Sequence, residues 1–240
     1  MKRRILVTGG SQGIGLAIAR GCAKAGDAVT VLSRTPPSEP FGLDHLACDL
    51  RDPAQVALVV SEWVDSDQAP VDALIHCAVA YGSTGRHPFA TNTVEEWDAA
   101  MQVNARGLML ALQQVLPGMT RRGRGLVIGL SSDVALGPGP QRIPYAASKA
   151  AAHAVLIGLA AELADSGVVV MQLAPTSQVD TPGIRSRRPP DFSPSGYAPA
   201  ECFVGPVLRM LGGEAARHHG ACLWVDADGT LRDAARQVIA

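Results

Sequence analysis

Short apolar segments alternate with longer amphipathic ones along most of the chain. Seven of the short segments are rich in Val, Ile and Leu, as is typical of buried strands: residues 3–8, 28–33, 45–48, 73–77, 126–128, 168–173 and 221–225. The segments between them have helical patterns, at residues 13–25, 53–65, 93–119, 145–164 and 200–211. Strands that alternate with helices indicate βαβ units. The pattern therefore predicts an α/β fold, a three-layer doubly wound parallel sheet (Rossmann) of about seven strands, formed by residues 1–240 as a single domain.

The first strand is followed by a glycine-rich turn and the start of a helix. The turn contains Gly9, Ser11, Gln12, Gly13, Ile14 and Gly15. Backbone N–H groups in such a turn and at the helix N-terminus can hold a pyrophosphate, so we expect a dinucleotide site here.

The end of the second strand decides which dinucleotide is preferred. An acidic residue at this position accepts a hydrogen bond from a ribose 2′-hydroxyl, whereas an arginine accommodates a 2′-phosphate. This chain has Ser33, Arg34 and Thr35 there. We therefore predict NADP(H) in preference to NAD(H).

A second candidate site lies between the fifth strand and an alanine-rich helix. Tyr145 and Lys149 are four residues apart and project from one face of that helix. An ammonium beside a phenol favours the phenolate, so we expect Lys149 to lower the pKa of Tyr145. The preceding strand ends in Ser131 and Ser132, whose hydroxyls would reach the same cleft.

Composition and charge exclude several other functions. The net charge is −1, which gives no basic field for nucleic acid. No apolar run reaches the roughly 18 residues of a membrane span without a charge or glycine, and the five cysteines lack Cys-x-x-Cys spacing. The adjacent His218 and His219 are expected to face solvent rather than bind metal. We predict a cytoplasmic protein with reduced thiols, no metal site and no membrane contact.

Together these motifs resemble those of the short-chain dehydrogenase/reductase family. The family pattern Thr-Gly-x-x-x-Gly-x-Gly matches residues 8–15, Tyr-x-x-x-Lys matches Tyr145 and Lys149, and the family serine 13 residues before the tyrosine matches Ser132. The resemblance implies catalysis by Ser132, Tyr145 and Lys149, with Asn104 supporting a water chain to the lysine. It also implies cofactor contacts by Asp49, Leu50, Ala78, Tyr145, Lys149, Pro175 and Thr181. Asp49 could equally cap the helix that begins at Pro53.

Two segments depart from the family pattern. Where relatives carry Asn-Asn-Ala-Gly, this chain has His76, Cys77, Ala78 and Val79, and Thr176 replaces a glycine after Pro175. Val79 affects how closely the backbone can approach the cofactor ribose. Thr176 affects where Thr181 is placed.

The loops and surfaces add hypotheses about substrates and partners. Tyr81, His87 and Phe89 are candidates for the substrate wall. Residues 185–199, with four prolines and three arginines, are interpreted as a mobile lid whose arginines could meet an anionic group. The basic turn at residues 121–124 is either solvated or a docking patch for a carrier protein or coenzyme A. The apolar helix at residues 150–164 needs cover on two sides, which favours a homodimer or homotetramer.

We expect an NADPH-dependent carbonyl reductase or secondary-alcohol dehydrogenase that acts on a small-molecule carbonyl. The resemblance to the 3-oxoacyl-carrier-protein reductase branch of the family makes a 3-oxoacyl thioester one candidate substrate. The alternative is a dinucleotide-binding regulator of the same fold without catalysis.

Overall fold

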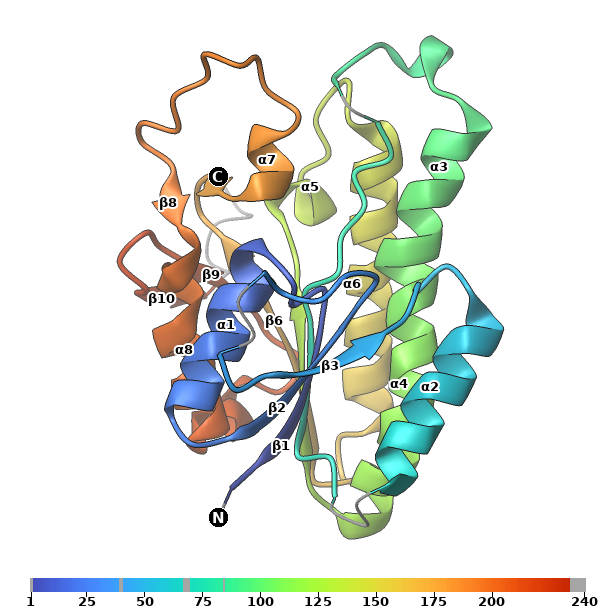
Figure 1. The fold of residues 1–240 in the computed structure, drawn as a ribbon, viewed down its shortest axis with the longest axis vertical. Coiled ribbons are helices and arrows are strands. Elements are labelled where there is room, and N and C mark those ends of the chain that lie inside the picture. Colours follow the sequence, from blue (N-terminus) through green and yellow to red (C-terminus); the bar gives the residue numbers. More distant parts are fainter. Residues whose placement is uncertain (1, 39–40, 67–69, 84, 234–240) are drawn as a thin grey trace.

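The computed structural model describes residues 2–38, 41–66, 70–83 and 85–233 (Figure 1). Its strands are β1 (Arg4–Thr8), β2 (Ala28–Ser33), β3 (Asp44–Ala47), β4 (Ala73–His76), β5 (Gly125–Leu130), β6 (Val168–Pro175), β7 (Val179–Asp180), β8 (Ala198–Pro199), β9 (Cys222–Val225) and β10 (Leu231–Asp233). Its α-helices are α1 (Gly13–Lys24), α2 (Pro53–Ser66), α3 (Val94–Met101), α4 (Gly107–Arg122), α5 (Asp133–Leu136), α6 (Ile143–Glu162), α7 (Pro182–Arg185) and α8 (Val204–Leu211). Single turns complete the pattern: η1 (Phe89–Thr91), the π-helical turn η2 (Gln102–Arg106), η3 (Ala200–Phe203) and η4 (Glu214–His218).

An eight-stranded sheet occupies the centre in the order β10-β9-β6-β5-β4-β1-β2-β3. All neighbours run parallel except β9 and β10, which are antiparallel. The seven predicted strands are present, which confirms the doubly wound parallel sheet. β10 is an addition, a three-residue strand too short to carry a pattern of its own. β7 and β8 form a separate two-stranded sheet.

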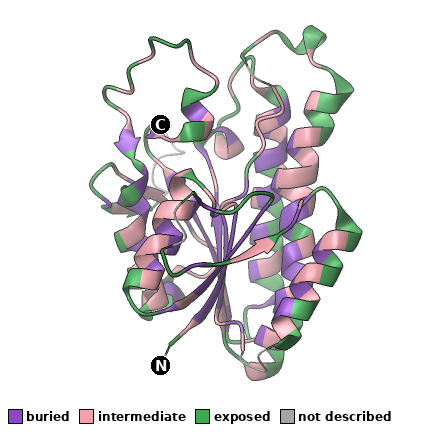
Figure 2. Cartoon of the chain, in the orientation of Figure 1, coloured by how far each residue is buried: buried purple, intermediate pink, exposed green. Residues whose placement is uncertain are grey.

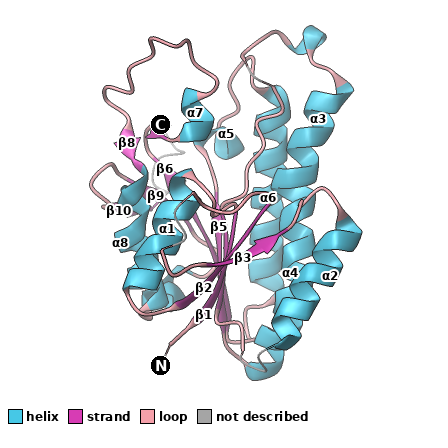
Figure 3. Cartoon of the chain, in the orientation of Figure 1, coloured by secondary structure: helices cyan, strands magenta, loops and turns pink. Residues whose placement is uncertain are grey.

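Helices cover both faces of the sheet because alternate strand residues point to opposite sides (Figures 1 and 3). In β1, Ile5 and Val7 pack with α1 and α8 on one face, whereas Leu6 packs with α2, α4 and α6 on the other. The central strands are buried throughout their length (Figure 2). These strands are therefore nearly continuous apolar runs, as the sequence pattern indicates.

Helices α3 and α4 are joined without a break by the π-helical turn η2. A capping box begins this helix: the Thr93 hydroxyl accepts from the Glu96 N–H at 3.2 Å, and the Glu96 carboxylate accepts from the Thr93 N–H at 3.1 Å. The extra residue of a π turn re-aims side chains, and such turns often occur at functional sites. Asn104 lies in the middle of this one.

Helix α6 is, among the described residues, the one helix long and apolar enough to cross a membrane by length and composition. In this fold it has the setting of a core helix, because Ala152, Leu156 and Ala160 pack against the sheet. Its outer side leaves Val155 and Ile157 37% and 39% exposed. This is the surface for which the sequence predicts a second subunit.

Candidate active site

Two cavities adjoin one another at the carboxyl ends of the parallel strands, where open α/β sheets bind ligands. The larger, the dinucleotide cavity, has a volume of about 590 Å³ and lies in front of the glycine turn. The smaller, the substrate cavity, has a volume of about 340 Å³ and contains Tyr145 and Ser132 in its wall. The two share Ile14, Val79, Tyr81 and Thr181, so a ligand in one would touch a ligand in the other.

The glycine turn fits a bound pyrophosphate. Gly9 has a left-handed φ of 67°, and a Cβ there would lie 2.5 Å from the Cα of Ala78, so the two backbones meet as closely as glycine allows. No side chain caps the first turn of α1, whose N-cap is Gln12. The uncapped N–H groups and the positive end of the helix dipole therefore face the cavity, the arrangement that binds a phosphate group.

The adenosine end of the same cavity is bordered by Arg34 and Arg51. Arg51 holds the Asp49 carboxylate through both oxygens, at 3.0 and 2.6 Å, and this hydrogen-bonded pairing lowers the pKa of Asp49. Arg34 contributes to the same lowering, so its charge lies close to Asp49. The helix cap predicted as one role of Asp49 is wrong, since Asp52 accepts from the N–H groups of Ala54 and Gln55 at 3.0 and 3.1 Å.

All but three of the residues predicted to bind the cofactor lie in the wall of the dinucleotide cavity. These are Gly9, Ser11, Gln12, Gly13, Ile14, Gly15, Ser33, Arg34, Thr35, Asp49, Leu50, Ala78 and Thr181. Tyr145, Lys149 and Pro175 border the adjoining substrate cavity. Ser33 and Thr181 are partly engaged: the Ser33 hydroxyl donates to the Thr35 carbonyl at 2.8 Å, and the Thr181 hydroxyl accepts from the Ile184 N–H at 3.3 Å.

Ser132, Tyr145 and Lys149 converge in the substrate cavity. Ser132 follows β5 as the N-cap of α5 and is 8% exposed, whereas Tyr145 and Lys149 lie one turn apart on α6. The Ser132 hydroxyl donates to the Asp133 carboxylate at 2.7 Å and lies near enough to the Tyr145 phenol to act on its pKa. Ser131, the neighbouring candidate, instead places its hydroxyl beside the Cys222 thiol. The structure therefore brings Ser132, and not Ser131, to the tyrosine.

The electrostatics of this cluster differ from the sequence expectation. Burial raises the pKa of Tyr145, against the opposing hydrogen bond from Ser132, and Lys149 is not among the groups that shift it. Lys149 is itself 5% exposed and donates to the Leu130 carbonyl at 2.8 Å, and burial lowers its pKa to about 8. The prediction that Lys149 lowers the pKa of Tyr145 is wrong for this structure, because burial raises that pKa and Lys149 does not contribute to the shift.

Asn104 clamps the loop that follows β4. Its side-chain amide accepts from the Ala80 N–H and donates to the Ala80 carbonyl, both at 2.7 Å, and donates to the Ser148 hydroxyl at 2.8 Å. The side chain is 1% exposed and lies outside the walls of both cavities. The structure therefore gives Asn104 a task in joining β4 to α6, and its predicted water-chain role stays a prediction.

Residues His76 to Val79, which differ from the family pattern, keep the close approach of the Ala78 backbone to Gly9. The His76 ring is 3% exposed, its Nδ1 lies 2.9 Å from the Thr8 hydroxyl, and burial lowers its pKa to about 3, so the ring is neutral at physiological pH. Val79, 42% exposed, adds apolar surface to both cavities.

Several loop predictions are wrong. Tyr81 lines the substrate cavity as expected, but Phe89 is 60% exposed outside it, and His87 is bound to Glu96 at 3.1 Å. The predicted lid at residues 185–199 contains the end of α7 and the strand β8, and its Arg187 and Arg188 border the substrate cavity, so the lid stays a prediction. His219, expected to face solvent, donates to the Ala160 carbonyl at 2.7 Å.

The basic turn at residues 121–124 precedes β5, whereas Ser132 follows it, so the turn lies at the opposite end of the strand from the site. Arg122 donates to the Val71 carbonyl at 2.6 Å and Arg124 lies 3.8 Å from Asp72. The turn therefore takes no part in either cavity.

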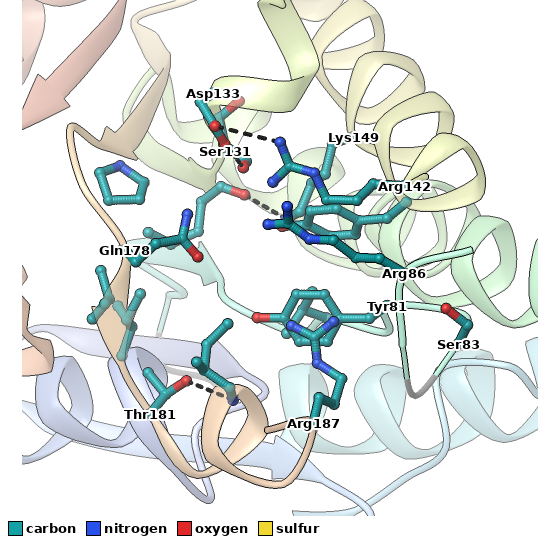
Figure 4. Close-up of a pocket in the computed structure, with 18 of the residues that line it drawn as sticks. Tyr81, Ser83, Arg86, Ser131, Asp133, Arg142, Lys149, Gln178, Thr181 and Arg187 are labelled. Atoms are coloured by element: carbon teal, nitrogen blue, oxygen red, sulfur yellow. Dashed lines mark hydrogen bonds and ion pairs between the residues drawn. The ribbon is translucent and has the colours of Figure 1, made fainter. Parts of the chain in front are cut away.

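Sequence reasoning missed Arg86, Arg142 and Gln178, which border the substrate cavity (Figure 4). One signal could have found Arg142. It is the N-cap of α6, where a cation meets the positive end of the helix dipole and is unfavourable. A residue that breaks a local rule in this way is a candidate for function.

Comparisons with known proteins agree with this geometry. The family model described as short chain dehydrogenase matches residues 3–190. An uncharacterized oxidoreductase of Staphylococcus epidermidis is 34% identical over 184 residues, covering 74% of this chain and 78% of that protein. The 2-(R)-hydroxypropyl-CoM dehydrogenase of Xanthobacter autotrophicus is 27% identical, covering 94% of this chain and 98% of its own.

Among solved structures, actinorhodin polyketide ketoreductase with NADPH superposes with a TM-score of 0.81 and 26% identity, covering 95% of this chain and 98% of its own. The fold, the glycine turn and the family match agree. The chain therefore belongs to the short-chain dehydrogenase family and is an NAD(P)-dependent oxidoreductase.

Proposed function

We propose that the protein reduces a small-molecule ketone with NADPH, or oxidises the corresponding secondary alcohol with NADP⁺. The observation that carries this proposal is the convergence of Ser132, Tyr145 and Lys149 in the wall of a cavity that opens directly onto the dinucleotide cavity. When bound, the nicotinamide ring supplies or accepts the hydride.

The side chains of this cluster would handle the proton and the developing charge. A substrate carbonyl oxygen between the Ser132 hydroxyl and the Tyr145 phenol would accept hydrogen bonds from both, and these strengthen as the oxygen becomes an alkoxide. Burial raises the pKa of Tyr145, so the phenol carries its proton at neutral pH and can donate it to that oxygen. Lys149 would bind the nicotinamide ribose.

The residues at the adenosine end support the choice of NADPH. Arg34 is exposed at the end of β2, and its neighbours Ser33 and Thr35 also border the cavity. Among the described residues of the cavity wall, Asp49 is the one carboxylate, and Arg51 binds it. A 2′-phosphate would therefore meet guanidinium groups rather than an unpaired acid.

The relatives do not select a substrate, since their names cover reactions as different as hydroxypropyl-CoM oxidation and polyketide ketoreduction. A 3-oxoacyl thioester remains one candidate, but the basic turn expected to dock its carrier lies away from the site. The exposed apolar face of α6 supports assembly into a homodimer or homotetramer. No observation favours a regulator without catalysis.

Replacing Tyr145 by Phe tests the proposal. The variant keeps the ring but loses the proton, so we expect turnover of NADPH with a panel of ketones to fall by about 100- to 10,000-fold. NADPH affinity, followed by cofactor fluorescence, should stay within about twofold, because the phenol borders the substrate cavity. Undiminished turnover in the variant would refute the assignment, and Tyr197→Phe, a tyrosine outside both cavity walls, is the matched control.

A further inference from the structure

The substrate cavity is strongly and asymmetrically charged. Its wall contains four arginines, Arg86, Arg142, Arg187 and Arg188, together with Lys149. Asp133 is the one carboxylate among the described residues of that wall. Figure 4 shows Arg86 and Arg142 directed into the cavity from the side of Lys149, and Arg187 beside Tyr81.

Two arginines outside the cavity show how closely this fold pairs a guanidinium with an acid. Arg3 contacts Asp27 at 2.8 Å, and Arg185 binds Asp180 through both carboxylate oxygens at 2.6 and 2.5 Å. In the cavity the nearest pair is Arg142 with Asp133, at 4.0 Å, and the Arg142 Nε is buried without a hydrogen-bond partner. The protein's own acids therefore leave these cavity guanidiniums largely uncompensated.

Arg142 is held at the cavity by an unfavourable local structure. It is the N-cap residue of α6, three residues before Tyr145, where the helix dipole repels a cation. The residue before it, Gln141, has a φ of 61°, in the left-handed region that side-chain-bearing residues rarely adopt. A cation kept in such a position needs a compensating interaction, and an anion in the cavity supplies one.

Arg187 approaches the same space from the other side. Its guanidinium carbon lies 3.3 Å from the centre of the Tyr81 ring, and that ring lies 4.9 Å from the ring of Tyr145. The Arg187 Nε donates to the Gly183 carbonyl at 3.1 Å, which fixes the side chain without neutralising it. Burial lowers the pKa of Arg187, and no carboxylate opposes this lowering. Its charge is therefore available to a ligand that lies beside Tyr145.

We infer that the substrate is a small ketone or secondary alcohol carrying a second, oxyanionic group, a carboxylate or sulfonate, which Arg142 and Arg187 bind while its carbonyl meets Ser132 and Tyr145. This inference rests on the proposed function, since it names the substrate class of the same site. Arginine suits the role because its planar fork matches two oxygens of one anion. The cavity volume of about 340 Å³ limits the ligand to a small molecule.

The test compares ketones that differ only in charge. Acetophenone, 4-acetylbenzoate and 4-acetylbenzenesulfonate form one set, and methyl 4-oxopentanoate and 4-oxopentanoate form another. We expect kcat/KM to be at least about tenfold higher for the anionic ketones than for the neutral ketones of the same set. Arg142→Gln or Arg187→Gln should raise the KM of the anionic ketones by about ten- to a hundredfold, with little change in the KM of the neutral ones. Arg142→Lys should restore part of the loss, and the carboxylate and sulfonate arms identify the preferred oxyanion.

Two controls separate this inference from the proposed function. Arg185→Gln, which loses an exposed pair with Asp180, should leave all KM values unchanged. Equal kcat/KM for charged and neutral ketones would overturn the inference while the reductase proposal stands. If no ketone is reduced, the reductase proposal fails, and ligand binding then tests the inference. Benzoate or benzenesulfonate, but not benzamide, should raise the Tm of the NADP⁺ complex in the wild type and not in Arg142→Gln. The absence of any such rise overturns the inference.

Discussion

The two cavities differ in how they are built along the chain. The dinucleotide cavity is assembled from short motifs at strand ends, chiefly residues 9–15 and 33–35, each of which carries its own local signature. The substrate cavity is assembled from three loops distant in sequence, around residues 81–92, 130–145 and 175–188. The first cavity is therefore recognisable from local motifs, whereas much of the second depends on contacts between distant loops.

This difference explains which parts of the site could be predicted from the sequence. Gly9 and Gly13 are recognisable because a strand, a glycine turn and a helix follow one another directly, and the strand periodicity predicts where they meet the sheet. Tyr145 and Lys149 are recognisable because they share one helix face. Ser132 is recognisable because it stands 13 residues before the tyrosine, as in the family pattern.

The remainder depends on contacts that no local pattern encodes. Arg187 reaches the site because Tyr81, more than 100 residues earlier, offers a ring for its guanidinium. His87 does not reach the site because Glu96 holds it. The raised pKa of Tyr145 likewise follows from burial by surrounding loops, which a four-residue spacing to Lys149 does not reveal.

The largest effect expected in the dinucleotide cavity alone comes from Arg34→Gln. Loss of charge-assisted bonds to a 2′-phosphate costs roughly 1.5–3 kcal/mol, so NADPH affinity should fall by about ten- to a hundredfold. NADH affinity should not change, and this serves as the internal control. Fluorescence titration of both cofactors measures the two values, and an equal loss for both would show that Arg34 does not read the 2′-phosphate.

A smaller effect is expected from Lys149, which lies where the two cavities meet. Its pKa is lowered from 10.5 to about 8, so between these values the unfolded chain binds more protons than the folded one, and stability rises with pH. We expect the free energy of unfolding of the wild type to rise relative to Lys149→Met by about 2 kcal/mol between pH 8 and 10.

Denaturant unfolding at the two pH values measures this change. The comparison with Lys149→Met is needed because the buried cysteines and tyrosines have raised pKa values and lose stability as pH rises above about 9. If the difference in unfolding free energy between the wild type and Lys149→Met does not change between pH 8 and 10, the pKa of Lys149 is not lowered by burial.

A crystal structure of the protein with NADP⁺ is the most direct test of the claim that the two cavities form one reductase site. The pyrophosphate should lie at the N-terminus of α1, the 2′-phosphate beside Arg34, and the nicotinamide ring at the junction of the cavities, facing Tyr145 and Ser132. A dinucleotide bound elsewhere, or a nicotinamide ring turned away from Tyr145, would contradict it.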